Sequence, residues 1–148
     1  MDNEIRCHFI YFNVEYVIKL HDWIIENTGG LAGVKDIGLI ESPIEHIQND
    51  WYYPELEDKL THLVYSISKN HAFHDGNKRS SIGIGSYFLE LNGFDYLVSR
   101  FVIQMEDIIV YVAGNKVNKE LLKKIIYSIL YEDDYSEDLK LELLIAVQ

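Results

Sequence analysis

The chain of 148 residues has a single cysteine, Cys7, so no disulfide can form within it. It has only two prolines, and no run comes near the roughly 18 uncharged apolar residues that a membrane-spanning helix needs. The first residues are acidic and no basic stretch leads into an apolar one, so we expect no secretory signal and a cytoplasmic location. Disorder is not indicated either, because 48% of the residues are hydrophobic and 25% are charged.

Basic residues are also few, with 13 lysines and arginines against 24 acidic residues and a net charge of −11. This balance argues against a nucleic-acid partner, because binding nucleic acid requires a basic face for the phosphates. Only the stretch 61–80 has more basic than acidic residues, with Lys69, Lys78 and Arg79 against Asp75. Such a cluster can hold a small anion, although chance scatter of charges gives the same pattern.

Apolar residues recur at helical spacing along most of the chain, which predicts an all-α fold. The first helix is expected between a cap at Asn13 and the pair Gly29-Gly30, with His21 on its apolar face. Pro54 suits the first position of a second helix that continues to residue 67. Further helices are expected over 82–91, over 101–112, from about 118 to 130 and, as a short last helix, from Ser136.

Signals for β structure are weak. The glycine-rich stretch 31–39 predicts a short β-hairpin or an irregular flap, and Tyr96-Leu97-Val98 is ambiguous. The acidic turn 132–134 is the best candidate for a boundary between a core and a short C-terminal tail. We therefore expect one compact domain over 1–131 and an acidic C-terminal extension over 132–148 that holds one short helix.

The stretch 69–81 carries the residues with the clearest chemical meaning. Asp75-Gly76-Asn77 is typical of a turn into a new helix, and the first turn of a helix exposes free N–H groups at the positive end of the helix dipole. This arrangement predicts an anion site, to which Gly76 allows close approach and to which Lys78 and Arg79 add charge. Cations are unfavourable for the helix at this position, which favours a functional reason for them.

Neighbouring side chains suit phosphoryl transfer. Asp75 is a hard oxygen ligand for Mg²⁺, and His71 can take a proton from an attacking hydroxyl. Asn77 can bind a phosphate oxygen or the turn, and Phe73 is expected to anchor the loop. Each residue alone has an ordinary explanation, as a polar loop histidine, a turn aspartate or a solvated cation. Their combination in this order favours the functional interpretation.

Other motifs for nucleotides, metals or nucleophiles are missing from the sequence. It contains no G-x-x-x-x-G-K-[ST] loop, and His71-x-x-His74 lacks the spacing and the glutamate of H-E-x-x-H. Cys7 precedes His8, but adjacency in sequence is weak support for a Cys/His nucleophile, and a buried or partly buried thiol is favoured. The histidines at 21, 46 and 62 are expected on helix faces.

The segment His71-Ala72-Phe73-His74-Asp75-Gly76-Asn77-Lys78-Arg79 resembles the motif H-x-F-x-D-[GA]-N-K-R of the Doc (death-on-curing) branch of the Fic/Doc family. The resemblance covers about 13–130. Within it, 29–42 is similar to the family's flap and the helix that follows, and 86–93 to the end of the helix after the motif. It implies a compact helical bundle with the motif at a junction between a loop and a helix.

The resemblance also implies a reaction. Fic-type relatives carry G-N-G-R and transfer AMP from ATP to a protein hydroxyl. Lys78 stands in place of the second glycine, which implies a toxin that transfers the γ-phosphate. The implied target is elongation factor Tu, whose modification arrests translation. The flap over 33–39 would hold the target segment by main-chain pairing.

Site residues and ligands follow from the same resemblance. His71 would be the base, Asp75 the Mg²⁺ ligand, and the residues after it the cradle for the phosphates of ATP. The expected catalytic residues are His71, Asp75, Lys78 and Arg79, and the expected nucleotide-binding residues are Phe73, Gly76, Asn77, Lys78 and Arg79.

Two alternatives remain, which are AMP transfer and a catalytically silent Fic/Doc fold that serves as a binding module. Some positions depart from the family pattern, because Pro43 and His46-Ile47 replace alanine and Arg-Pro, and Ile82 replaces a second arginine. Without that arginine, the match of 128–132 to an inhibitory helix is taken as coincidence. We therefore expect inhibition by a separate antitoxin.

Overall fold

The computed structural model describes residues 8–148, and all of the regular elements in this range are helical. The all-α fold expected from the sequence is therefore confirmed. Cys7, for which a buried or partly buried thiol was favoured, lies outside the described residues. In chain order the elements are α1 (Val14–Thr28), α2 (Gly38–His46), α3 (Leu56–Lys69), α4 (Asn77–Leu91), the 3-10 helix η1 (Asp95–Leu97), α5 (Val98–Ala113), α6 (Lys119–Tyr131) and α7 (Glu137–Ala146).

Polar side-chain caps fix three of the helix starts that the sequence predicts. The side chain of Asn13 accepts the N–H of Tyr16 at 3.0 Å at the start of α1. Asn118 and Ser136 cap α6 and α7 in the same way. The prediction for Pro54 is wrong, since α3 begins two residues later, at Leu56. A capping box between Glu55 and Asp58 sets this later start.

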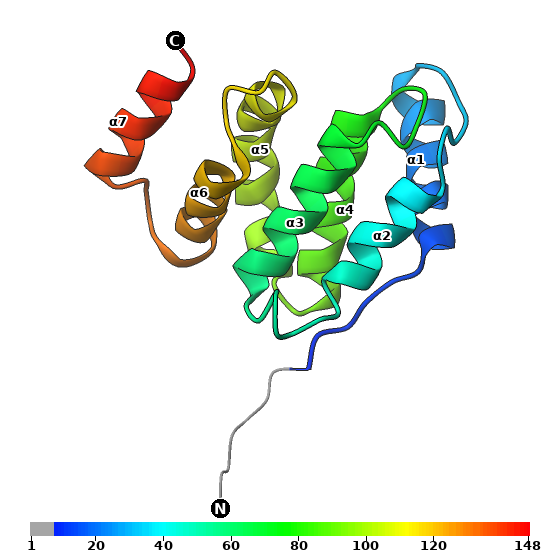
Figure 1. The fold of residues 1–148 in the computed structure, drawn as a ribbon, viewed down its shortest axis with the longest axis horizontal. Helices are drawn as coiled ribbons and strands as arrows, with labels where there is room; N and C mark the ends of the chain where they lie inside the picture. The colour runs from blue at the N-terminus through cyan, green and yellow to red at the C-terminus, as the bar shows by residue number, and fades with distance from the viewer. Residues whose placement is uncertain (1–7) are drawn as a thin grey trace, which may run out of the picture.

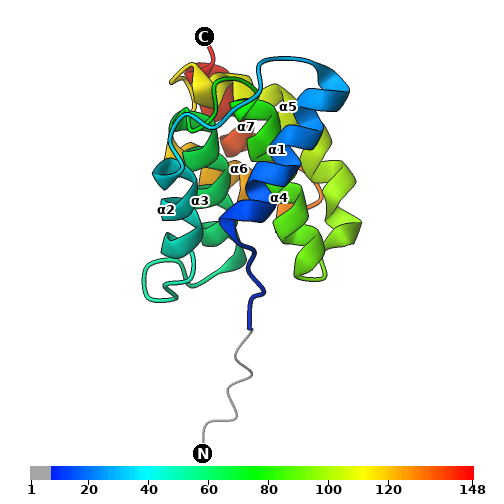
Figure 2. The same ribbon diagram turned by 90° about the vertical axis from the view of Figure 1, so that its right-hand side faces the viewer.

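Helices α3 and α4 form the centre of the bundle (Figure 1). Helix α3 packs against α4, α6, α2 and α5, and α4 packs against α3, α5 and α1. Seen from the side, α1 and α2 lie over α4 and α3 (Figure 2). The side chains that fill the centre have no exposed surface, and they include Leu60, Ile67, Ile84, Phe88, Phe101 and Ile126.

The segment between α1 and α2 is an irregular flap rather than a β-hairpin. Its main chain bonds to the loop between α3 and α4 instead of to itself, with Lys35 N donating to Ala72 O at 2.7 Å and His74 N donating to Gly33 O at 3.3 Å. Val34 and Phe73 form an isolated antiparallel bridge. The end of the predicted flap is helical, because α2 begins at Gly38, where the Asp36 side chain accepts the Gly38 N–H at 3.0 Å. The ambiguous run at 96–98 is η1 followed by the first residue of α5.

Beyond α6 the chain turns through 132–136 into α7, which packs on α6 (Figure 1). Leu139 is the buried residue of α7, and Lys124 of α6 pairs with Glu142 of α7 at 3.1 Å. The short helix expected in the acidic extension is present, whereas the division of the chain into a domain and an extension at residue 131 stays a prediction.

Across residues 8–148, none of the helices has both the length and the apolar character required to cross a membrane.

Candidate active site at the start of helix α4

The loop over 70–76 connects α3 to α4, and the flap lies beside it at the same end of the bundle (Figures 1 and 2). Gly76 caps α4 with φ 77° and ψ 19°, a left-handed conformation that glycine adopts without strain. The first backbone bond of the helix runs from Ser80 N to Gly76 O at 2.9 Å. The N–H groups of residues 77–79 therefore have no partner within the helix, and no side chain caps them. They are the donors that the anion site predicted from the sequence requires.

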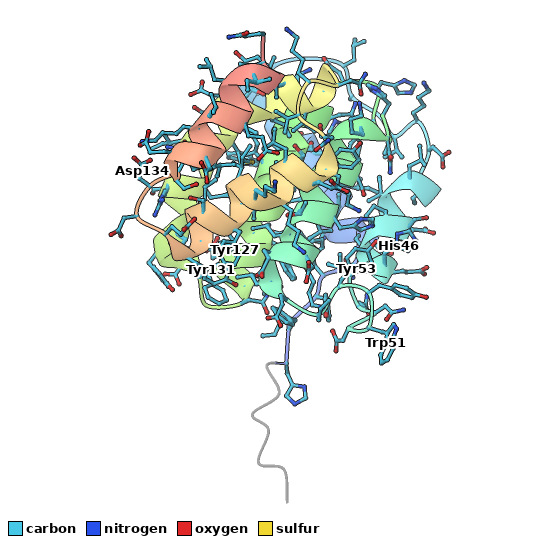
Figure 3. All side chains as sticks on the ribbon, turned by 60° about the vertical axis from the view of Figure 1, so that its left-hand side comes forward. His46, Trp51, Tyr53, Tyr127, Tyr131 and Asp134 are labelled. Atoms are coloured by element: carbon cyan, nitrogen blue, oxygen red, sulfur yellow. The ribbon has the colours of Figure 1, made fainter. Side chains whose placement is uncertain are left out.

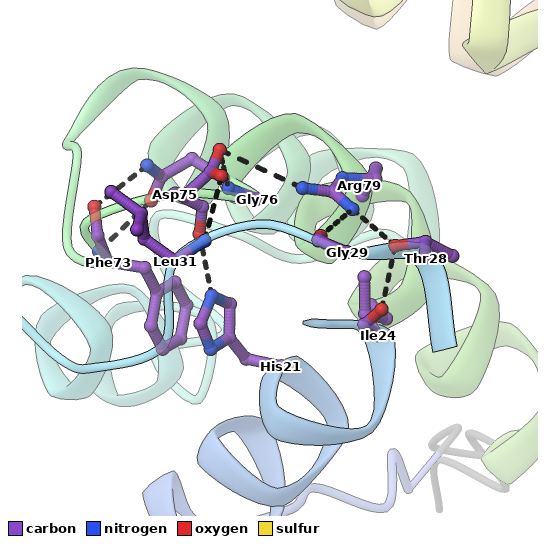
Figure 4. A network of polar contacts seen from close by, with 10 residues as sticks. His21, Ile24, Thr28, Gly29, Leu31, Phe73, Asp75, Gly76 and Arg79 are labelled. Atoms are coloured by element: carbon purple, nitrogen blue, oxygen red, sulfur yellow. Dashed lines mark hydrogen bonds and ion pairs between the residues drawn. The ribbon is translucent and has the colours of Figure 1, made fainter. Parts of the chain in front are cut away.

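Asp75 presents its carboxylate at this helix start (Figure 4). Oδ1 accepts the N–H of Gly76 at 2.8 Å, and Oδ2 accepts the N–H of Leu31 from the flap at 3.1 Å. These two hydrogen bonds are the main reason that the pKa of Asp75 lies below its ordinary value, and the nearby Arg79 guanidinium lowers the pKa further. The carboxylate is therefore ionised at neutral pH and remains 44% exposed.

Asn77 and Phe73 tie the loop together. The Asn77 side chain accepts the N–H of Phe73 at 3.1 Å and donates to its carbonyl at 3.0 Å. Phe73 is only 1% exposed, and its ring stacks on that of His21 with the centroids 3.8 Å apart. Of the two roles considered for Asn77, the structure shows the one in the turn. Phe73 anchors the loop as expected, so it can act on a nucleotide only through the loop and not by direct contact of its ring.

The two cations of the first turn lie in different surroundings. Arg79 donates to Gly29 O at 2.9 Å and to Thr28 Oγ1, and its Nη2 lies 3.7 Å from Asp75 Oδ1. It thus joins the end of α1 to the acidic residue of the loop. The side chain of Lys78 is exposed, and the structure shows no hydrogen bond or ion pair for it within the described range. Lys78 is therefore the cation of this turn that is free to meet an anion.

His71 lies in the same loop with an exposed side chain and a left-handed backbone, at φ 52°. Positive φ is unusual for a residue other than glycine and is enriched at functional sites. His74 is also exposed and packs against Gly33 of the flap. Both imidazoles are accessible to solvent, as a base that meets a hydroxyl of another protein must be.

Sequence reasoning missed the contribution of α1 and the flap to this site. His21 Nε2 lies 2.6 Å from the backbone oxygen of Asp75, and the main chain at Leu31 holds the carboxylate (Figure 4). The only signal for His21 was a single polar residue on an otherwise apolar helix face. Backbone donors such as Leu31 leave no signal in the residue type.

Residues of this site fit a hydrated Mg²⁺ ion. Asp75 supplies one ionised, partly exposed carboxylate, and each of its oxygens keeps a second lone pair beside the hydrogen bond that it already accepts. Mg²⁺ commonly takes one or two carboxylates and completes its shell with water and phosphate oxygens. The described part of the chain holds no group of three or more His, Cys, Asp or Glu side chains that could form an all-protein cage, and binding of Mg²⁺ by Asp75 stays a prediction.

Cavities of a size typical for small ligands occur away from this loop. One of about 410 Å³ lies between α6 and α7 and includes Tyr127 and Leu139 in its wall. Another of about 390 Å³ is lined by His46, Asn49, Tyr52 and Tyr53. Figure 3 shows Tyr127 on α6, and His46 and Tyr53 beside the first part of α3. The chemistry of the motif, rather than the depth of a cavity, therefore locates the candidate site.

Comparison with known proteins agrees with this geometry. A model described as "Fic/DOC family" matches residues 11–89. The chain is 36% identical over 89 residues to "Toxin Doc" of Mycolicibacterium smegmatis, which covers 57% of this chain and 68% of that relative. It is also 36% identical over 87 residues to "Protein kinase doc" of Escherichia phage P1, which covers 56% of this chain and 68% of the relative. The chain belongs to the Fic/Doc family. The names of both relatives confirm the Doc branch, which the lysine at position 78 indicates.

Proposed function

We propose that this protein is a Doc-type toxin that transfers the γ-phosphate of ATP to a hydroxyl group of a target protein. The single observation that carries this proposal is the start of α4, where three free N–H groups, an exposed lysine and an ionised carboxylate share one turn. A solvent-accessible histidine, His71, lies in the loop that leads into this turn. The similarity to a relative named "Protein kinase doc" supports the same reaction.

In the proposed reaction the hydroxyl oxygen of the target attacks the γ-phosphorus, and the bond from that phosphorus to the β–γ bridging oxygen breaks. His71 takes the proton of the hydroxyl, and ADP leaves. Lys78 and the N–H groups at the start of α4 stabilise the charge on the phosphate oxygens. Asp75 would hold Mg²⁺, which neutralises phosphate charge when it is bound.

Arg79 has a second task in this arrangement. Because one of its nitrogens holds the end of α1 and the other faces Asp75, it fixes the flap and the carboxylate relative to each other. Its remaining N–H groups can contribute to the phosphate cradle. Some main-chain groups of the flap do not face the motif loop. An extended segment of the target could pair with these groups.

Partners follow from the proposed role. The proposed target is elongation factor Tu, which places the protein in the cytoplasm. Similarity to a relative named "Toxin Doc" supports a toxin, and we propose that a separate antitoxin restrains it. The match of 128–132 to an inhibitory helix does not support inhibition within the chain. Glu132 follows α6 and lines the cavity between α6 and α7, whereas Arg79 pairs with Asp75.

The experiment is label transfer in bacterial lysate with ATP labelled at either the α- or the γ-phosphate. We expect γ-label, and no α-label, on one band that mass spectrometry identifies as elongation factor Tu. Transfer of α-label would instead assign AMP transfer. If the folded protein transfers neither label, the proposal is wrong and the binding-module alternative holds.

A further inference from the structure

His21 is a buried titratable group that the proposed function leaves unused. It lies on α1 with no exposed surface, and its imidazole ring lies next to the turn that leads into α4 (Figure 4). Histidine is seldom fully buried without a specific partner. The residues around it belong to the motif loop, so its partners connect α1 to the candidate active site.

The contacts of this ring show that its Nε2 atom carries a proton. Nε2 lies 2.6 Å from the carbonyl oxygen of Asp75. A carbonyl oxygen can only accept, so Nε2 carries a proton and donates it. The flat face of the ring stacks on Phe73, with the ring planes 3° apart. A single side chain therefore contacts Phe73, which anchors the loop, and Asp75, which precedes the Gly76 cap of α4.

The second ring nitrogen shows that packing alone does not explain the histidine. Nδ1 is buried and has no hydrogen-bond partner among the described residues, and the carboxylate of Asp22 is 3.7 Å away. A buried polar atom without a partner is destabilising, and an apolar ring at position 21 would avoid that cost. The bond from Nε2 to the turn is the feature that an apolar ring could not supply.

The turn transmits this bond to the carboxylate of Asp75. In a planar trans peptide the C=O and the N–H point in opposite directions. The C=O of the peptide between Asp75 and Gly76 meets His21, and the N–H of the same peptide donates to Asp75 Oδ1 at 2.8 Å. Holding the carbonyl therefore fixes the N–H, which in turn orients the carboxylate.

We propose that His21 is a positioning residue for the transfer reaction. Through the carbonyl of Asp75 it sets the direction of the Asp75 carboxylate and of the first N–H groups of α4, without contact to the nucleotide. The catalytic meaning of this inference rests on the proposed function, whereas its claim about the turn stands on the contacts of His21 alone.

Two substitutions separate the donor of His21 from its packing. In His21→Gln the amide nitrogen lies the same number of bonds from Cα as Nε2, so the donor is kept and the stacking is lost. In His21→Phe the aromatic packing on Phe73 is kept and the donor is lost. The matched control is His62→Gln, because His62 is also buried and hydrogen-bonded but faces His46 and Lys119.

The first measurement needs neither nucleotide nor metal. In the NMR spectra of the full chain we expect His21→Phe to move the carbonyl ¹³C resonance of Asp75 and the amide resonance of Gly76. We expect His21→Gln to leave both near their original positions, and His62→Gln to leave them unchanged. If both resonances stay in place in His21→Phe, the proposed role is overturned.

The second measurement is label transfer as a function of Mg²⁺ concentration. We expect His21→Phe to lower kcat by about 10- to 100-fold, as small misplacements of reacting groups do, and to raise the Mg²⁺ concentration for half-maximal rate. His21→Gln should recover most of both values. Equal losses in the two variants, in proportion to their losses in Tm, would show a merely structural role. If the parent protein transfers no label, the proposed function fails, and the NMR result still decides the role of His21.

Discussion

Gly30 of the flap lies so close to Asp75 that a Cβ atom at position 30 would come within 2.5 Å of Asp75 Oδ2. Arg79 Nη2 would be 3.1 Å from the same Cβ. The backbone of the flap therefore touches the carboxylate and guanidinium groups of the candidate site, and only glycine permits this approach.

This contact predicts that Gly30→Ala displaces the Asp75 carboxylate. We expect a fall in transfer rate of about 10-fold or more, because a small misplacement of a reacting group is costly. Gly29→Ala is the matched control, since Gly29 also has positive φ but a Cβ there would meet nothing within 4 Å. Both variants should lose stability from backbone strain, by about 1 kcal/mol or more. Steady-state kinetics beside thermal unfolding would separate the two effects, and equal activity of the two variants would refute the expectation.

Lys78 predicts which part of ATP is transferred. Its side chain fills space and adds charge where Fic-type relatives have glycine, and it is exposed at the start of α4. We expect Lys78→Gly to shift transfer from the γ-phosphate toward AMP, which labelled ATP reveals. Stability should change by no more than the glycine penalty at a helix start, about 1 kcal/mol. An unchanged donor group in a folded variant would contradict the argument.

Lys59 lies outside the candidate site, and we expect its side chain to contribute to the stability of the fold. It has no exposed surface, and its Nζ donates to Ile47 O at 2.6 Å and to Asp50 Oδ1 at 2.7 Å. Lys59→Met keeps the volume but removes both bonds, so we expect a loss of about 1–3 kcal/mol in the free energy of unfolding. Lys124→Met, which removes an exposed pair with Glu142, should cost about 1 kcal/mol or less. Urea unfolding measures both, and equal losses would show that the burial of Lys59 is unimportant.

His62 predicts how stability depends on pH. Burial, followed by the nearby Lys119 and His46, lowers its pKa from 6.5 to about 4. The unfolded chain then binds a proton at this residue before the folded chain does, so folding is favoured above the unfolded pKa. The contribution of His62 is complete above pH 6.5 and is lost as the pH falls toward 4. Urea midpoints are measured at several pH values across this window. As the pH falls, the midpoint should drop more steeply for the parent than for His62→Gln, and parallel profiles would refute the assignment.

Local signals in the sequence were enough to predict most of the fold. The cap at Asn13, the stop at Gly29 and the turn at Gly76 each act within a few residues of a helix end, and all three are present. Helix α2 is harder to predict from periodicity. It has only nine residues, Pro43 lies inside it, and Ile40 and Ile44 are its only buried aliphatic side chains apart from that proline. Its nature came from the family resemblance and not from periodicity.

The motif residues of the candidate site were also predictable, since they lie within one turn and one loop. Their partners were not, because they come from distant segments. The bond of His21 to Asp75 spans 54 positions and that of Arg79 to Gly29 spans 50. No local pattern specifies which helix end an arginine reaches. The sequence thus predicts which groups gather at the start of α4, the fold shows what holds them, and their catalytic roles stay predictions.

The most direct test of the central claim is label transfer by His71→Ala, with His74→Ala as the control from the same loop. We expect His71→Ala to bind ATP as the parent does and to transfer γ-label about 10²–10⁴-fold more slowly, because it lacks the positioned base. His74→Ala should transfer label within a few fold of the parent rate. Transfer by His71→Ala at the parent rate would show that His71 is not the base.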